Sequence, residues 1–233
     1  MAEDTKPVNE DKWCFAWFAE QQPTTGTDRA ALVTGSKWQG SNPTISISFL
    51  DGTDAQKALV RRFAVEWITN LANLNFSWQA APNTDIRISF QYSGSWSVIG
   101  TTAKNIPKNQ PTMNFGWLTP GVTDEEARRV ILHEFGHALG LIHEHQNPLG
   151  TINWNKPAVI ADLSGPPNNW DPATIQHNMF EQYPSNSIAG TPLDWHSIML
   201  YPIPKSWTND GTSAGMNNTL SDDDKKFIRK QYP

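Results

Sequence analysis

Strict alternation of apolar and polar residues marks two short segments in the first half of the chain. In Thr44–Leu50, the apolar side chains of Ile45, Ile47 and Phe49 are separated by serines, so they fall on one side of an extended chain. The segment Asp85–Gln91 alternates in the same way. This period of two predicts a half-buried β-strand at each place.

Helical periodicity lies between these strands. A capping box at Thr53 and Gln56 opens a stretch in which apolar residues recur at every fourth position: Leu59, Phe63, Trp67 and Leu71. Short strands are predicted at 93–100 and 113–118, separated by a polar loop with two prolines at 101–112. Strand, helix and strand in this order indicate an α/β or α+β lobe.

The second half of the chain begins with one more helix and then loses its regular pattern. A capping box at Thr123 and Glu126 predicts a helix through the histidine-rich segment that follows. Nine prolines lie between Gln146 and Lys205, and only a short helix at 171–183 is predicted there. The chain closes with a helix capped by Ser221, whose three aspartates at its start suit the helix dipole.

Length and composition limit the classes of function. A chain of 233 residues with 38% hydrophobic residues can bury one large core or two lobes around a cleft. It has no apolar run near the roughly 18 residues that span a bilayer, and its net charge of -5 argues against nucleic-acid binding. We therefore expect neither a membrane nor a nucleic acid as partner. Cys14 is the only cysteine, which excludes an internal disulfide and a cysteine-based zinc site.

Four of the six histidines lie within His133–His145. On a helix that turns about 100° per residue, His133 and His137 share one narrow stripe, and Glu134 lies at its edge. Histidines at i and i+4 can both direct a ring nitrogen to one zinc ion at about 2.0–2.1 Å. Glu134 then lies close enough to contact a zinc-bound water without being a ligand.

A third ligand requires the helix to end. On an unbroken helix, His143 would lie about 9 Å beyond His137 along the axis, but Gly140 can adopt the left-handed conformation that turns the chain back. Three neutral imidazoles leave zinc one open position, as in catalytic sites, where Glu134 can take the proton of the bound water. A structural site closed by His145 as a fourth ligand is the alternative.

The spacing H-E-x-x-H-x-x-G-x-x-H is the metzincin signature, and Ser197-Ile-Met-Leu-Tyr201 resembles the Met-turn of that group. The resemblance is closest to the astacin branch, in which a glutamate follows the third histidine, as Glu144 does here. Residues 94–100 resemble the astacin strand at the upper rim of the cleft. Leu200 departs from the histidine of the family's Met-turn, and the usual two disulfides cannot form, so the chain resembles a cysteine-poor, microbial-type member.

The resemblance implies a metzincin-like α+β fold. A twisted sheet and helices would form the N-terminal lobe, and an irregular C-terminal lobe with a terminal helix would complete a zinc cleft between the two. We expect an N-terminal segment at 1–37 and a catalytic domain at 38–233, with lobes at 38–140 and 141–233. Cys14, in the first segment, is interpreted either as a thiolate switch on the zinc or as a small buried hydrophobe.

The resemblance also implies the activity of a zinc endopeptidase with one catalytic ion. In this interpretation Tyr201 stabilises the oxyanion and Met199 forms a hydrophobic floor, while substrate-binding residues are expected at Trp96, Ser97 and Val98. Protein or peptide substrates, a monomeric state and an extracellular location follow from the same resemblance. The alternatives are a non-catalytic peptide- or carbohydrate-binding module and a zinc hydrolase that acts on another substrate. A binding module has no need for Glu134.

Overall fold

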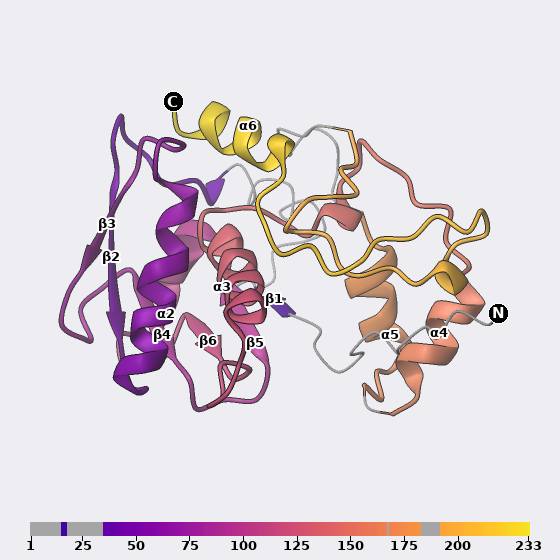
Figure 1. Ribbon diagram of the computed structural model, residues 1–233, viewed down its shortest axis with the longest axis horizontal. Helices are drawn as coiled ribbons and strands as arrows, with labels where there is room; N and C mark the ends of the chain where they lie inside the picture. The colour runs from indigo at the N-terminus through magenta and orange to yellow at the C-terminus, as the bar shows by residue number, and fades with distance from the viewer. Residues whose placement is uncertain (1–14, 18–34, 167, 183–191) are drawn as a thin grey trace.

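The computed structural model describes residues 15–17, 35–166, 168–182 and 192–233, in two parts that lie side by side (Figure 1). One part holds the β-sheet with helices packed on it, and the other holds short helices and long connections. The described part of the chain has no helix of the length and apolar character needed to cross a membrane.

Within the described residues the sheet has six strands in the order β1-β5-β6-β4-β2-β3. The antiparallel pair is β5 with β6, and every other neighbouring pair is parallel. In chain order the strands are Phe15–Trp17, Thr44–Phe49, Asn75–Trp78, Ile86–Ser89, Ser95–Val98 and Met113–Phe115. The four strands expected from the sequence are confirmed, whereas β1 and β3 were not predicted, although Asn75–Trp78 alternates polar and apolar residues.

The sheet is covered on both faces, so the expectation of half-buried strands is wrong for β4. All four residues of β4 are buried. The side chain of Arg87 turns toward the loop at 101–112 and donates hydrogen bonds to the carbonyls of Ile106, Pro107 and Gln110. Part of that loop forms a 3-10 helix, Gly100–Asn105. The loop therefore covers the face that the polar positions were expected to present to water.

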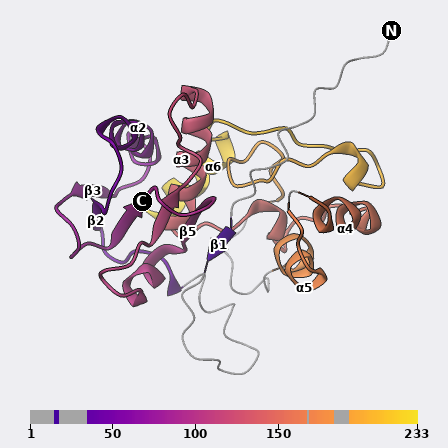
Figure 2. The ribbon, with the colours of Figure 1, turned by 90° about the horizontal axis from the view of Figure 1, so that it is seen from below.

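Helices α2 (Asp54–Ala64) and α3 (Asp124–Ala138) lie side by side on one face of the sheet (Figure 2). The capping box of α2 is present as predicted. Beyond α2 the predicted apolar stripe continues as a 3-10 turn, Val65–Trp67, and the chain then passes through Asn70, which adopts a φ of 57°. Trp67 is fully buried and its indole N–H donates to the Leu132 carbonyl of α3 at 2.8 Å, which joins the two helices.

The second part of the molecule has its own apolar core. It contains α4 (Lys156–Ser164), α5 (Pro172–Ile175) followed by the π-helical turn η4 (Gln176–Phe180), and the 3-10 turns η3 (Glu144–Gln146) and η6 (Lys205–Trp207). The short helix after residue 171 is confirmed, but α4 was not predicted. Pro157 lies in the first turn of α4, where the missing N–H breaks no helical hydrogen bond, so this proline does not exclude a helix.

The terminal helix α6 (Asp222–Gln231) packs against the sheet part and supports the end of α3. The hydroxyl of Tyr232 donates to the Leu139 carbonyl at 2.8 Å, and the indole N–H of Trp38 donates to the Ala138 carbonyl at 2.8 Å. The last carbonyls of a helix have no partner within it. These two bonds therefore fix the point at which α3 ends and the next segment begins.

Candidate active site

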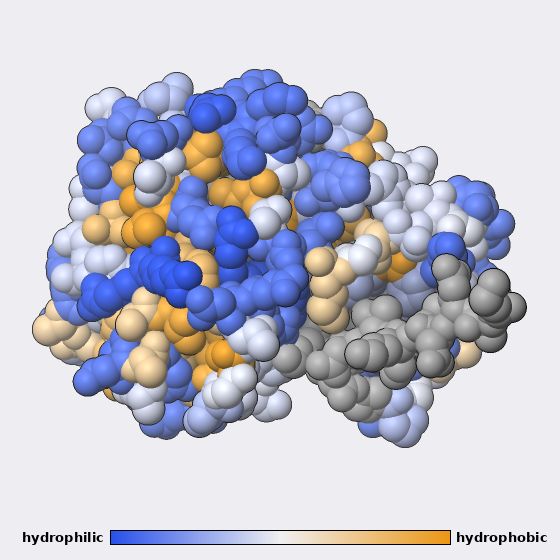
Figure 3. Space-filling view, viewed as in Figure 1, coloured by the Kyte–Doolittle hydropathy of each residue, from blue (hydrophilic) through white to orange (hydrophobic). Residues whose placement is uncertain are grey.

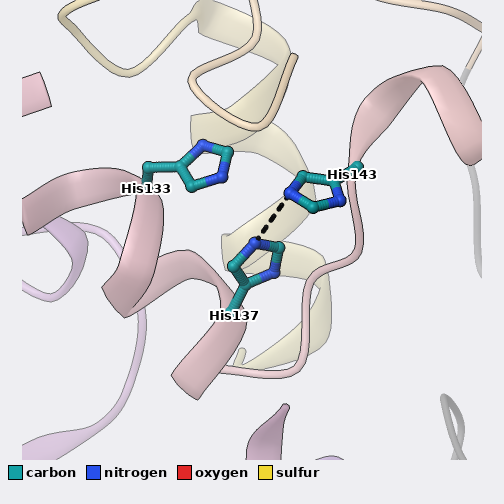
Figure 4. A group of neighbouring side chains, drawn as sticks. All are labelled: His133, His137 and His143. Atoms are coloured by element: carbon teal, nitrogen blue, oxygen red, sulfur yellow. Dashed lines mark hydrogen bonds between the residues drawn. The ribbon is translucent and has the colours of Figure 1, made fainter. Parts of the chain in front are cut away.

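Helix α3 carries the first two histidines and the glutamate of the motif. His133, Glu134 and His137 are buried on it. Thr123 caps the start of the helix by accepting from the Glu126 backbone, while the Glu126 side chain accepts from Arg129 instead of closing the predicted capping box. The rings of His133 and His137 point toward one another and toward His143 (Figure 4).

The turn after α3 brings in the third histidine as the sequence predicts. Gly140 has a φ of +102°, a left-handed conformation that favours glycine. Its N–H donates to the His137 carbonyl at 2.8 Å, and the Leu141 N–H donates to the Gly136 carbonyl at 3.0 Å. These two bonds form a Schellman motif. The chain then reverses, and His143 approaches from the extended segment beyond (Figure 4).

The three histidines form a group that fits a metal ion. One ring nitrogen from each lies within 4.8 Å of the others, and the Nε2 atoms of His137 and His143 are 3.2 Å apart. Two nitrogens about 2.0–2.1 Å from a tetrahedral zinc are separated by about 3.3 Å, so this spacing suits the ion. The group found among the described residues does not include His145, which was the alternative fourth ligand.

Hydrogen bonds to backbone carbonyls fix which nitrogen of the His133 and His137 rings faces the centre. The Nδ1–H of His133 donates to the Ile198 carbonyl at 2.8 Å, and that of His137 donates to the Leu141 carbonyl at 2.9 Å. Each Nε2 therefore carries a lone pair. The Nε2 of His133 is buried without a hydrogen-bond partner among the described residues. A buried acceptor in this state is what a metal ligand requires, because the ion takes the place of the missing donor.

The electrostatics of the group favour neutral imidazoles. Burial, more than the neighbouring histidine, holds the pKa of His133 well below its usual range, and the same two causes lower the pKa of His143. Burial also lowers the pKa of His137 to about 4. The three rings are thus unprotonated at neutral pH, which is the form that binds a metal ion.

The Met-turn residues lie beside the histidines. The ring of Tyr201 is centred 4.2 Å from the ring of His143 and 6.3 Å from that of His133, and the residue is buried. Met199 is buried against α3, where its sulfur lies so near Gly136 that a Cβ there would be 2.3 Å from it. The structure thus brings Glu134, Met199 and Tyr201 together with the three histidines.

The expected substrate-binding residues lie on β5, beside α3. Ser97 and Val98 are buried, and Trp96 is partly exposed and contacts Tyr92 edge-on. One edge of β5 pairs with β6 and the other with β1, in which Ala16 is opposite Ser97. Cys14 and its two interpretations lie outside the described residues.

Asp224, near the end of the chain, supports the site, and this role was not predicted from the sequence. Asp224 is buried and accepts hydrogen bonds from the Ser197 hydroxyl, the Ile198 N–H and the Ser221 N–H. The aspartates at 222–224 indicated only a helix start, and Asp224 does complete the capping box of α6. Its second role is to hold the Met-turn. The local sequence does not predict this role, because the two Met-turn partners lie 26 and 27 residues away.

Comparisons with known proteins agree with this geometry. The family model for the astacin peptidases matches residues 33–150. A structure of myroilysin is 40% identical over 86% of this chain and 97% of its own, with a TM-score of 0.83, and a second myroilysin structure is 41% identical over 85% and 86%, with a TM-score of 0.64. High choriolytic enzyme 1, a hatching enzyme zinc-protease from Oryzias latipes (medaka fish), shares the fold at 19% identity over 85% and 95%, with a TM-score of 0.56. A search of curated proteins found no match.

Proposed function

Because this chain belongs to the astacin family of peptidases and is a zinc-dependent endopeptidase, we propose that Glu134 and Tyr201 carry its chemistry beside the three histidines. The observation that carries the assignment is that one ring nitrogen each from His133, His137 and His143 lies within 4.8 Å of the others in a buried group. Those three residues would hold the zinc ion. Bound there, zinc supplies a Lewis acid that polarises the scissile carbonyl and lowers the pKa of water.

Glu134 is the general base and then the general acid. It lies one residue after His133 on α3 and is fully buried, so its carboxylate is held beside the metal ligands without belonging to the group. In this position it takes a proton from the attacking water and delivers it to the nitrogen of the leaving amine. Transfer of that proton through one carboxylate completes the hydrolysis without a second acid.

Tyr201 stabilises the charge that develops on the substrate. Its ring lies against His143, which places the phenol at the edge of the metal site. A phenolic O–H in a buried site can donate a hydrogen bond to the oxyanion of the tetrahedral intermediate. Removal of one such donor typically lowers kcat by about 10²–10³-fold, so Tyr201→Phe is expected to act mainly on kcat.

The substrate is proposed to bind as an added strand along β5, with Trp96, Ser97 and Val98 supplying contacts. In the structure β1 pairs with that edge of β5, with Phe15 opposite Trp96 and Trp17 opposite Val98. A peptide that takes this edge has to displace β1. We therefore propose that residues 1–37 form a segment separate from the catalytic domain at 38–233, whose lobes divide at residue 140, and that trimming residues 1–34 raises activity.

The protein is proposed to act as a monomer on protein or peptide substrates outside the cell, without binding nucleic acid or membranes. The net charge of -5 supports the absence of a nucleic-acid face. On the face in Figure 3 apolar residues form small patches among hydrophilic ones, which supports a monomer. The family supports the extracellular location. Light scattering after gel filtration tests the oligomeric state.

The activity is tested by digesting a denatured protein mixture with the zinc-loaded chain and with the chain trimmed before residue 35. Cleavage that 1,10-phenanthroline abolishes is expected. Glu134→Gln should retain stoichiometric zinc and lose cleavage, whereas Glu125→Gln, an exposed position on the same helix, should behave as the unchanged protein. Cleavage by Glu134→Gln would refute the base. Zinc-bound protein that binds peptide but cleaves nothing, trimmed or not, would indicate a binding module.

A further inference from the structure

His145 lies two residues beyond the third metal ligand and stacks on Tyr201. The ring centroids of His145 and Tyr201 are 4.7 Å apart with planes 29° apart, and those of His145 and His143 are 5.4 Å apart at 21°. Tyr201 also contacts His143. The phenol ring is thus in contact with two imidazoles, one a member of the metal group and the other outside it.

A turn in the second part of the molecule, η4, holds the imidazole of His145 by a hydrogen bond. Its Nε2 lies 2.7 Å from the Asn178 carbonyl in η4, and the side chain of Gln146 donates to the adjacent His177 carbonyl at 3.0 Å. A carbonyl accepts only from a donor, so the proton of His145 is on Nε2 and the lone pair is on Nδ1. This bond fixes both the tautomer and the position of the ring.

Nothing in simple packing requires an imidazole at this position. The residue is buried, and its Nδ1 has no hydrogen-bond partner among the described residues. An unsatisfied buried acceptor destabilises the fold relative to an apolar ring. A phenylalanine would fill a similar volume without that cost, but it could not bond to the Asn178 carbonyl. The anchor to η4 is therefore the property that selects histidine.

We propose that His145 is a positioning residue for Tyr201. Anchored by η4, its ring forms a fixed wall that holds the phenol against His143, so that the hydroxyl is preorganised for the developing oxyanion. His145 contacts neither zinc nor substrate in this role and acts through Tyr201 alone. The inference rests on the role of Tyr201 in the proposed function.

A double-mutant cycle tests the coupling. His145→Ala is expected to lower kcat about tenfold and to leave KM within about twofold, because a loosely held donor stabilises the transition state less. In the Tyr201→Phe background, where the hydroxyl is already absent, the same change should alter kcat by less than about twofold. His196→Ala, at an exposed histidine near the Met-turn, is the matched control. Equal losses of kcat in both backgrounds would overturn the proposal.

A second measurement does not depend on activity. The chain has four tyrosines, so protein labelled with ¹³Cζ-tyrosine gives four NMR signals, and Tyr201→Phe identifies one by its loss. In metal-free His145→Ala the signal of Tyr201 should broaden or shift while the other three stay in place. An unchanged Tyr201 signal overturns the proposal.

Two further outcomes are distinguished in the same experiments. If His145→Ala does not fold, as shown by movement of all four signals, the cycle is run with His145→Phe, which keeps the ring volume and loses the anchor; the same coupling to Tyr201 is expected. If Tyr201→Phe alone leaves kcat unchanged, the role of Tyr201 in the reaction fails, while the NMR measurement still decides whether His145 positions its ring.

Discussion

The imidazole of His133 and the carboxylate of Asp224 are joined through a single residue of the Met-turn, Ile198. The Nδ1–H of His133 donates to the Ile198 carbonyl at 2.8 Å, and the Ile198 N–H donates to Asp224 at 2.9 Å. Asp224 belongs to the first turn of α6. The terminal helix therefore orients a histidine of the proposed metal site that lies 91 positions earlier in the chain.

Removal of the Asp224 carboxylate should weaken zinc binding. We expect Asp224→Ala to lower zinc affinity about 10–100-fold, the usual effect of losing a group that orients a ligand, and to destabilise the fold because three donors lose their acceptor. Competition with a chromophoric chelator measures the affinity. Asp223→Ala, in the same helical turn, is the control, and equal affinities for the two variants would contradict the prediction.

Gly136→Ala should destabilise the protein even though alanine favours a helix. An added Cβ would lie 2.3 Å from the Met199 sulfur and 3.2 Å from the Trp67 ring. Overpacking of this kind costs about 1–3 kcal/mol, which exceeds the roughly 1 kcal/mol gained in helix propensity. Urea unfolding of the metal-free protein measures the difference. Gly215→Ala, where nothing lies within 4 Å of the added Cβ, should be near neutral; a stabilised Gly136→Ala would show that α3 does not pack on Met199 as described.

Arg87→Lys should cost much more than an arginine-to-lysine change at the surface. The buried guanidinium donates to five backbone carbonyls of the segments before and after β4: Thr84, Asp85, Ile106, Pro107 and Gln110. The ammonium group of lysine has three donors and cannot reproduce the five hydrogen bonds of the planar guanidinium. We expect a loss of roughly 3 kcal/mol in unfolding free energy, measured by urea denaturation. Arg229→Lys, an exposed position on α6, should change stability by less than about 0.5 kcal/mol.

The metal-free protein should lose stability as the pH falls below 6.5, in part through His145. Burial lowers the pKa of His145 from 6.5 to about 4, so between these values the unfolded chain binds more protons than the folded one. The contribution of the neutral ring is complete above pH 6.5 and is lost as the pH falls toward 4.

Comparison with His145→Phe isolates that contribution. Glu144 acts in the opposite direction: burial raises its pKa to about 7, so its contribution is present below 4.5 and lost as the pH rises through 7. Because Glu144 is common to both proteins, the variant should show a slope of unfolding free energy against pH that is smaller by at most about 1.4 kcal/mol per unit between pH 4 and 6.5. Parallel curves from urea titrations at several pH values would rule out a buried neutral His145.

The sequence by itself determined the parts of the site that depend on local geometry. The spacing of His133 and His137 places both on one helical stripe, and Gly140 supplies the left-handed turn that returns His143 to them. The sequence also predicted the helix caps at Thr53 and Ser221 and the alternation in β2. In each case residues within a few positions of one another decide the outcome, because helix and strand periods and cap conformations are local properties.

Only the tertiary structure decided what surrounds and supports those residues. The bond from His133 to Ile198 spans 65 positions, and the contact of His145 with Tyr201 spans 56, so neither leaves a periodic signal. The pairing of β1 with β5 and the covering of β4 by a loop depend on how distant segments meet in space. Long-range contacts are chosen by packing and by the satisfaction of buried polar groups across the whole fold, which no short window of sequence contains.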